Sequence, residues 1–188
     1  TLVQWSMDLS QPSQVAVRLD AWLDAQPTAD IASATLINNA GMIPRIGPID
    51  QCPGNELEDA LRVGLEAPMQ LTAAFLRATR HWTADKRVLH ISSGLGRRAM
   101  AAQGPYCAVK AALDHLARAQ ALEEALLAHG AKVVSLAPGI IDTDIHASGG
   151  LPDRVKQTAP MVPMQRAGSA EEVAQAIVWL LSQESSYT

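Results

Sequence analysis

Apolar residues in this chain occur in two alternating patterns: short, nearly continuous runs and longer stretches with helical spacing. The short runs cover residues 2–7, 34–37, 88–92 and 133–137, and each is followed by polar or turn-forming residues. Runs of this length, bounded by turn residues, are typical of strands buried on both faces. Because helical stretches separate them, the chain is predicted to form a parallel sheet with helices on both sides, an α/β fold of three layers.

Four helical stretches are predicted. The first begins at residues 10–12, and the longest covers residues 55–80, where Pro68 should cause a kink or a break. The third runs from Pro105 to residue 128, and the last begins at Ser169, whose spacing to Glu172 matches a capping box. Their apolar stripes consist of Val15, Leu19, Trp22 and Leu23, of Leu57, Leu61, Leu65, Leu71 and Leu76, of Val109, Leu113, Leu116 and Leu122, and of Val173, Ile177, Leu180 and Leu181.

Length and composition favour one globular domain over residues 1–188. Hydrophobic residues make up 48% of the chain and charged residues 18%, with a net charge of -4 and no basic run. These values argue against disorder and against nucleic-acid binding, so the expected partner is a small molecule or another copy of the chain. No apolar stretch approaches the length of a membrane span and no signal-peptide pattern is present, which makes the cytoplasm the expected location.

Cysteine and histidine do not indicate a metal site or a disulfide framework. The chain has two cysteines, Cys52 and Cys107, which we expect to be packing residues in a reducing compartment. Its five histidines share no metal-ligand spacing. No metal is therefore expected.

Polar and turn residues follow three of the predicted strands. Asn38 comes after the run 34–37, Ser93 follows the run 88–92, and Pro138 follows the run 133–137. In open parallel sheets, ligands bind beyond the carboxyl ends of the strands. This rim of the sheet is therefore the predicted site.

A tyrosine and a lysine stand at helical spacing close to the same rim. If Pro105 opens a helix, Tyr106 and Lys110 lie one turn apart on one face, so that the ammonium can approach the phenol. A phenol is a poor acid at neutral pH, but an adjacent cation favours phenolate and lowers the pKa. A surface pair is the alternative interpretation of this spacing alone.

Taken together, the motifs resemble those of the short-chain dehydrogenase/reductase family over essentially the whole chain. The matching segments are Asp8, residues 38–41 (Asn-Asn-Ala-Gly), Ser92 and Ser93, Tyr106 with Lys110, residues 138–143, and residues 166–172. The resemblance implies a Rossmann-like, doubly wound parallel sheet. Residues 106–112 and 136–144 are most similar to the sepiapterin-reductase and benzil-reductase subgroup.

The resemblance also implies an activity and a set of roles. The chain would be a nicotinamide-dependent carbonyl reductase or alcohol dehydrogenase, with NADPH favoured and NADH possible. Tyr106 would be the proton donor or acceptor, Lys110 would lower its pKa and bind the nicotinamide ribose, and Ser93 would orient the carbonyl. Cofactor contacts would come from Asp8, Asn38, Asn39, Ala40, Gly41, Pro138, Gly139, Ile141 and Thr143.

The sequence departs from the family pattern in its extent. It begins at what resembles the third strand, without the first two strands and their glycine-rich turn, and it stops before the last strand. Because a sheet that lacks a central strand exposes unpaired backbone groups, we expect a partial sequence of a longer chain. The alternative is a non-catalytic, oligomerising relative that has lost cofactor binding.

A second departure lies in the long helix. Gly64 occupies the place where relatives usually carry an asparagine, at a kink whose backbone carbonyl holds a water in the proton relay. Glycine keeps that carbonyl and tolerates a distorted backbone, but it lacks the amide side chain. Altered proton transfer is expected, with Gly64→Asn raising turnover.

Two further features concern the substrate and the assembly. Residues 145–165, rich in glycine and proline, are expected to form a flap over the substrate. Its expected apolar lining comprises Leu95, Met100, Ile145, Met161 and Met164. The two long helices carry small residues on what we expect to be their outer sides, Ala73, Ala74, Ala117 and Ala121; in relatives these helices pair across a twofold axis, which implies a homodimer or homotetramer.

Overall fold

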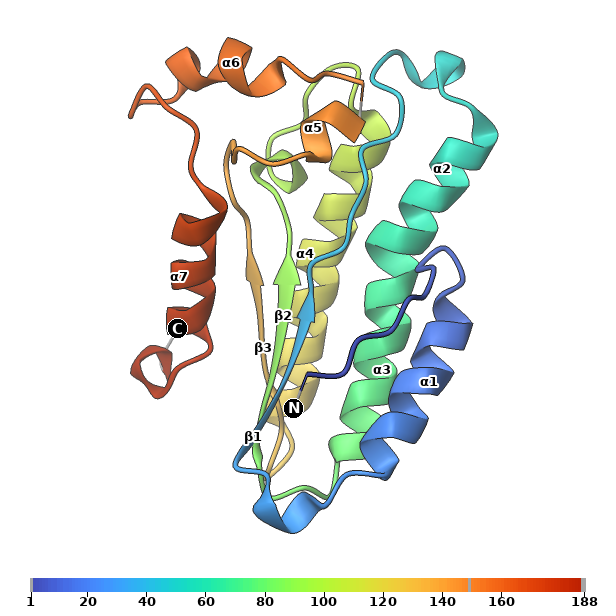
Figure 1. Ribbon diagram of the computed structural model, residues 1–188, viewed down its shortest axis with the longest axis vertical. Coiled ribbons are helices and arrows are strands. Elements are labelled where there is room, and N and C mark those ends of the chain that lie inside the picture. The colour runs from blue at the N-terminus through green and yellow to red at the C-terminus, as the bar shows by residue number, and fades with distance from the viewer. Residues whose placement is uncertain (1, 149, 187–188) are drawn as a thin grey trace.

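The computed structural model describes residues 2–148 and 150–186, and its centre is a parallel sheet (Figure 1). The three strands are β1 (Ser33–Asn38), β2 (Asp85–Ile91) and β3 (Lys132–Leu136), in the order β1-β2-β3. Leu36 pairs with Val88, and Val88 pairs with Val133. The three runs from 34 onward are therefore strands, as predicted.

Helices lie on both sides of this sheet. The longer ones are α1 (Pro12–Asp24), α2 (Gly54–Leu61), α3 (Ala67–Thr79), α4 (Gly104–Ala125) and α7 (Ala170–Leu180); α5 (Ile145–Ser148) and α6 (Arg154–Thr158) are short. Figure 1 shows α7 on one side of the strands and α1 to α4 on the other. This arrangement confirms the three-layer α/β prediction.

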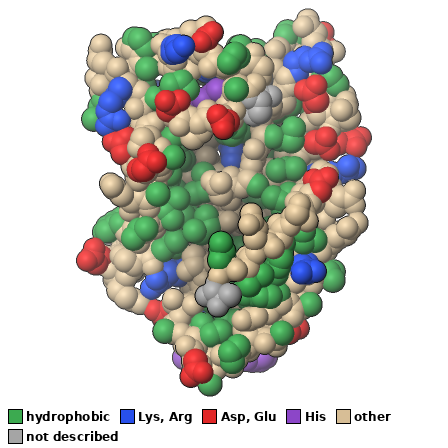
Figure 2. All heavy atoms as spheres, viewed as in Figure 1, with side chains coloured by type: hydrophobic (Ala, Val, Ile, Leu, Met, Phe, Trp, Pro, Cys, Tyr) green, Lys and Arg blue, Asp and Glu red, His purple; other side chains and the backbone are tan. Residues whose placement is uncertain are grey.

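The prediction of a strand over residues 2–7 is wrong. The segment is extended but has no ladder partner among the described residues, and Leu2 is 90% exposed. A strand requires a neighbour to bond its backbone groups, and the hydrophobic pattern alone does not supply one. Figure 2, drawn from the same side as Figure 1, shows hydrophobic side chains gathered across the middle of the face turned to the viewer.

The long helix is interrupted where a kink was expected. A π-helical segment, Arg62–Glu66, separates α2 from α3, and the Ala67 N–H donates to the Arg62 carbonyl. Pro68 has no N–H to donate to the Gly64 carbonyl four residues earlier, which explains why regular α-helical bonding fails here. Such segments often occur at functional sites.

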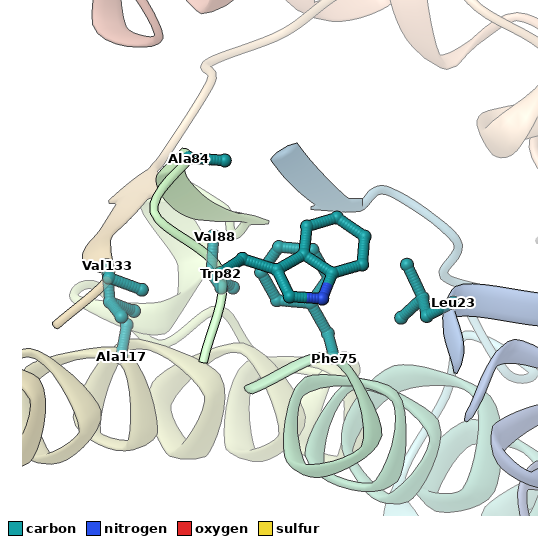
Figure 3. Close-up of a cluster of buried hydrophobic side chains, with 8 residues drawn as sticks. Leu23, Phe75, Trp82, Ala84, Val88, Ala117 and Val133 are labelled. Atoms are coloured by element: carbon teal, nitrogen blue, oxygen red, sulfur yellow. The ribbon is translucent and has the colours of Figure 1, made fainter. Parts of the chain in front are cut away.

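The main core lies between the sheet and helices α1, α3 and α4. It contains Leu23, Phe75, Trp82, Ala84, Val88, Ala117, Ala131 and Val133. Figure 3 shows Trp82 beside Phe75, between the strands and the helices. Two of the alanines expected on outer helix surfaces are buried: Ala74 is 0% and Ala117 is 3% exposed, so the prediction is wrong for them because these positions face the core.

Helix α7 is capped at its N-terminus and bonded to the sheet at its C-terminus. Ser169 and Glu172 form the predicted capping box, and Arg166 makes a two-pronged ion pair with Glu172. At the other end, Arg87 of β2 donates to the Leu181 carbonyl and Lys132 of β3 donates to the Leu180 carbonyl. These cations satisfy carbonyl groups that a helix C-terminus leaves free.

Candidate active site

The carboxyl ends of β2 and β3 meet at one rim, as predicted. The Ser92 N–H donates to the Leu136 carbonyl at 2.7 Å, and the Gly94 N–H donates to the Pro138 carbonyl at 3.3 Å. The loops that follow these two strands are therefore bonded to each other.

Ser93 begins a tight turn that lies directly against α4. Its hydroxyl accepts a hydrogen bond from the Leu95 N–H and caps one turn of 3-10 helix, Gly94–Gly96. A Cβ atom at Gly96 would lie 2.9 Å from the carbonyl carbon of Lys110, so only glycine permits this approach. The Ser92 hydroxyl also donates to the Lys110 carbonyl, at 3.3 Å. Ser93 is thereby held beside the segment of α4 that carries Tyr106 and Lys110.

Tyr106 and Lys110 are both buried on the inner face of α4. Tyr106 is 8% exposed, and the Ser93 side chain is near enough to oppose the effect of burial on the Tyr106 pKa. Lys110 is 3% exposed; its Nζ donates to the Ile91 carbonyl at 2.7 Å and lies 5.7 Å from the centroid of the Tyr106 ring. The structure thus brings Ser93, Tyr106 and Lys110 together.

Burial has the largest effect on the pKa values of Tyr106 and Lys110. Burial raises the pKa of the Tyr106 phenol, and the Ser93 side chain only opposes that shift. Burial lowers the pKa of Lys110 to about 8, and the negative charge of Asp114 opposes the decrease. Desolvation is the largest effect on the Tyr106 pKa, and the Lys110 ammonium donates to the Ile91 carbonyl; the lowering of the Tyr106 pKa by Lys110 stays a prediction.

The segment after β1 approaches the same cluster from the other side. A Cβ atom at Gly41 would lie 3.3 Å from Lys110 Nζ, so the glycine leaves space beside the ammonium. Asn39 and Ala40 are exposed. The Asn38 side chain does not reach the rim: it is 6% exposed, and its amide contacts Thr72 Oγ1 at 3.1 Å and His90 Nδ1 at 3.3 Å beneath the sheet.

Asp8 is exposed, and its carboxylate accepts hydrogen bonds from the N–H and hydroxyl of Ser10 at 2.8 Å, which lower its pKa. The adjacent Leu9 borders a hollow of about 60 Å³ together with Asn39 and Ala40. Asp8 thus directly precedes a residue that lines the same hollow as the turn of residues 38–41.

The loop after β3 is pinned by the segment that leads into α7. Ile141 pairs with Gly168, the Gly168 N–H donates to the Ile140 carbonyl, and the Asp142 N–H donates to the Gly168 carbonyl, both at 2.9 Å. A Cβ atom at Gly168 would lie 2.7 Å from Ile141 Cδ1. Within the loop Pro138 and Ile141 are half-buried, while Gly139 and Thr143 are exposed.

Gly64 is buried against α4. A Cβ atom there would lie 2.5 Å from Val109 Cγ1, so the Val109 side chain occupies the space that a larger residue at position 64 would need. Val109 immediately precedes Lys110 in the helix. The Val109 side chain therefore fits against the π-helical segment before α3 only because position 64 is a glycine.

The predicted flap contacts the loop that precedes Tyr106. Arg154 Nη2 lies 3.0 Å from the sulfur of Met100, and Gln103 Nε2 lies 3.1 Å from the same atom. Met161 and Met164, which were expected to line the pocket, are 81% and 71% exposed. Their outward position shows that the lining prediction does not hold for these two methionines.

Sequence reasoning missed two polar residues behind the site. Asp114 lies one turn beyond Lys110, and His90 lies three residues before Ser93; both are buried. The position of Asp114 directly after Leu113, on the apolar stripe of α4, could have indicated that this carboxylate is buried. His90 was counted only as a polar residue.

Two kinds of feature were not found among the described residues. No group of histidine, cysteine or acidic side chains that could hold a metal ion is found within residues 2–148 and 150–186. In the same part of the chain, every helix is too short or too polar to span a bilayer.

Known proteins show clear similarity to this chain. The family model described as enoyl-(acyl carrier protein) reductase matches residues 3–188. A benzil reductase, (S)-benzoin forming, of Bacillus cereus is 30% identical over 190 residues, which cover 95% of this chain and 74% of that protein. The uncharacterised oxidoreductase YgfF of Escherichia coli (strain K12) is 36% identical, over 96% of this chain and 72% of its own length.

A solved structure agrees with the sequence matches. The crystal structure of a protein described as an NAD(P)-dependent gluconate 5-dehydrogenase from Beutenbergia cavernae, with bound NADP, superposes with a TM-score of 0.82 at 28% identity. The match covers 97% of this chain and 70% of that one.

Proposed function

The chain belongs to the short-chain dehydrogenase/reductase family, and we propose that it is a nicotinamide-dependent oxidoreductase that interconverts a small carbonyl compound and its alcohol. The observation that carries this proposal is the cluster at the rim: the buried Tyr106 phenol near the Ser93 side chain, with the buried Lys110 ammonium 5.7 Å from the ring centroid. Burial and paired polar groups of this kind mark a candidate site for proton transfer.

In the reductive direction, Tyr106 is the proton donor. Its raised pKa keeps the phenol protonated at neutral pH, and a developing alkoxide is basic enough to take that proton. The Ser93 hydroxyl holds the substrate oxygen beside the phenol. The Lys110 ammonium supplies the positive charge that stabilises the phenolate left after transfer.

The residues at the rim fit a nicotinamide cofactor. A Cβ atom at Gly41 would fill the space beside Lys110 Nζ, and the lysine is buried with a proton donor facing that space. Asp8, the turn of residues 38–41, Lys110 and the loop of residues 138–143 would hold the cofactor, with Asn38 contributing through its backbone. The nicotinamide supplies the hydride. NADPH is favoured over NADH because the Beutenbergia structure is bound to NADP.

One relative supports a proposal for the substrate class. The Bacillus cereus protein is a benzil reductase, so a compact dicarbonyl compound is the proposed substrate type. Arg154 and Met100, which join the flap to the loop before Tyr106, are proposed to border such a substrate.

A binding titration followed by an activity assay tests the proposal. Full-length protein is titrated with NADPH and with NADH by fluorescence, and cofactor oxidation is then followed with benzil. Tyr106→Phe should lose activity by at least about 100-fold while still binding cofactor. If neither cofactor binds, the enzyme proposal fails and a non-catalytic role is favoured.

The remaining aspects of the proposal concern organisation. We expect one domain, a homodimer or homotetramer, and a cytoplasmic location. Exposed apolar side chains of α2 and α4 support self-association: Leu61 is 51% exposed, and Leu126, directly after α4, is 87% exposed. Leu122 is 73% exposed, so its expected place on the buried stripe of α4 is wrong. Sedimentation of the wild-type protein measures the assembly.

A further inference from the structure

Asp114 is a buried carboxylate without a hydrogen bond. It is 4% exposed, and neither Oδ1 nor Oδ2 has a hydrogen-bond partner among residues 2–148 and 150–186. Buried polar groups are nearly always bonded, and an isolated buried charge is strongly unfavourable. A residue that breaks this rule beside a catalytic cluster requires a functional explanation.

Three cationic residues lie in the neighbourhood of Asp114, and one of them, Arg97, makes an ion pair with the carboxylate. Lys110 lies one turn earlier on the same helix face, and Arg97, in the turn after Ser93, has its Nε 3.9 Å from Asp114 Oδ2. Arg118, one turn later, donates from Nε to the Asp114 backbone carbonyl at 3.2 Å. The Arg97 side chain is 73% exposed, so solvent screens its charge. Lys110, which is 3% exposed, is the cation that water screens least.

His90 of β2 interacts electrostatically with Asp114, and it is neutral. Its Nδ1 lies 3.3 Å from the Asn38 amide nitrogen, which can only donate, so Nδ1 must accept. Its Nε2 lies 3.0 Å from Gln120 Oε1 and must carry the proton. A histidine with one accepting and one donating nitrogen holds no net charge, and burial lowers its pKa further. His90 therefore does not neutralise Asp114.

We propose that Asp114 is a positioning residue of the active site, whose buried carboxylate is the counter-charge that keeps Lys110 in its ammonium form. Two opposite charges buried one helical turn apart stabilise each other more than two exposed ones. The attraction offsets part of the cost of burying each charge. The Asp114 carboxylate has no hydrogen bond, and the Lys110 ammonium donates to the Ile91 carbonyl. The consequence for catalysis rests on the proposed function, in which the charge of Lys110 stabilises a phenolate.

A direct titration of Lys110 tests this without any substrate. The chain has four lysines, Lys86, Lys110, Lys132 and Lys156, so their side-chain NMR signals can be followed with pH and the Lys110 signal assigned through Lys110→Met. Neutralising Asp114 with Asp114→Asn should lower the Lys110 titration midpoint by about one pH unit. Asp114→Glu, which keeps the charge, should stay within a few tenths of the wild-type midpoint, on the order of ordinary context effects.

Matched variants exclude a merely structural effect. Glu124→Gln neutralises another buried acid of α4, whose carboxylate accepts from the Ala131 N–H, and should leave the Lys110 midpoint in place. Asp114→Ala provides a second neutral variant if Asp114→Asn does not fold. An unchanged Lys110 midpoint in either neutral variant overturns the proposal, as does an equal decrease in Glu124→Gln.

Kinetics give an independent measurement. In the reductase assay, the alkaline limb of kcat/KM should move to lower pH by the same amount in Asp114→Asn and should remain in place in Asp114→Glu. A wild-type protein without reductase activity would defeat the proposed function but leave the NMR result valid. A neutral variant with an unchanged pH profile would defeat the role of Asp114 while the enzyme assignment stands.

Discussion

Burying the Lys110 ammonium should cost folding stability, and that cost should disappear at alkaline pH. Burial lowers the pKa of Lys110 from its usual 10.5 to about 8. Below pH 8 both the folded and the unfolded chain hold the proton, and the full cost is present. Between pH 8 and 10.5 the unfolded chain binds more protons than the folded one, so stability rises with pH through this window.

The magnitude follows from the size of the shift. One pKa unit corresponds to about 1.4 kcal/mol, so the decrease to about 8 corresponds to a cost of about 3 kcal/mol. Lys110→Met removes the charge and hence the cost. It also removes the hydrogen bond to the Ile91 carbonyl, which is worth about 1.5–3 kcal/mol when the donor is charged. Lys110→Met also leaves the buried Asp114 carboxylate without its proposed counter-charge, so the pH dependence, and not the difference at neutral pH, is the informative quantity.

Urea unfolding, followed by tryptophan fluorescence between pH 7 and 10.5, measures this dependence. The unfolding free energy of the wild type should gain about 3 kcal/mol relative to Lys110→Met across the range. Groups common to both proteins cancel in the difference. Lys156→Met, at a side chain that is 85% exposed, controls for the change of net charge. Parallel curves for the wild type and Lys110→Met would refute the reasoning.

Three further substitutions test contacts around the site. Gly64→Asn alone should destabilise the protein by about 1–3 kcal/mol, the usual cost of overpacking, because its Cβ meets Val109 Cγ1. In the double variant with Val109→Ala, urea unfolding should show that the lost stability is recovered, and turnover should exceed that of Gly64→Asn alone. Gly168→Ala should raise the KM for cofactor with little change in kcat, because its Cβ displaces Ile141 in the loop after β3; an unchanged KM would count against that loop as a cofactor contact. Ser169→Ala should lower the urea midpoint through a loss of about 1 kcal/mol at the cap of α7, and an unshifted midpoint would contradict the role of the capping box.

The sequence predicted the positions of the candidate site residues well where two kinds of periodicity agreed. The buried runs locate β1 to β3, and parallel strands necessarily bring their carboxyl ends to one rim, so Ser93 and Pro138 could be placed together. Helical spacing then puts Tyr106 and Lys110 on one face of α4. None of these steps needs a contact that is remote in sequence.

The failures have equally specific causes. A run such as residues 2–7 predicts a strand only if another strand bonds to it, and no periodicity reveals the partner. Asn38 shares the side-chain direction of Leu36, which packs on the core, so strand alternation already placed its amide beneath the sheet. The sequence leaves the pKa of Tyr106 undecided, because that pKa depends on how much water remains beside the phenol, which spacing does not report.

The alignment of the site depends on how β2 is held against α4, because Ser93 follows the first and Tyr106 belongs to the second. Three contacts make this junction: Gly96 against the Lys110 backbone, the Ser92 hydroxyl on the Lys110 carbonyl, and the Lys110 ammonium on the Ile91 carbonyl. The first two involve only the backbone of Lys110, whereas the third needs its side chain. Loss of activity in Lys110→Met therefore combines a lost charge with a weakened junction, while a change at Asp114 alters the charge and leaves all three contacts in place.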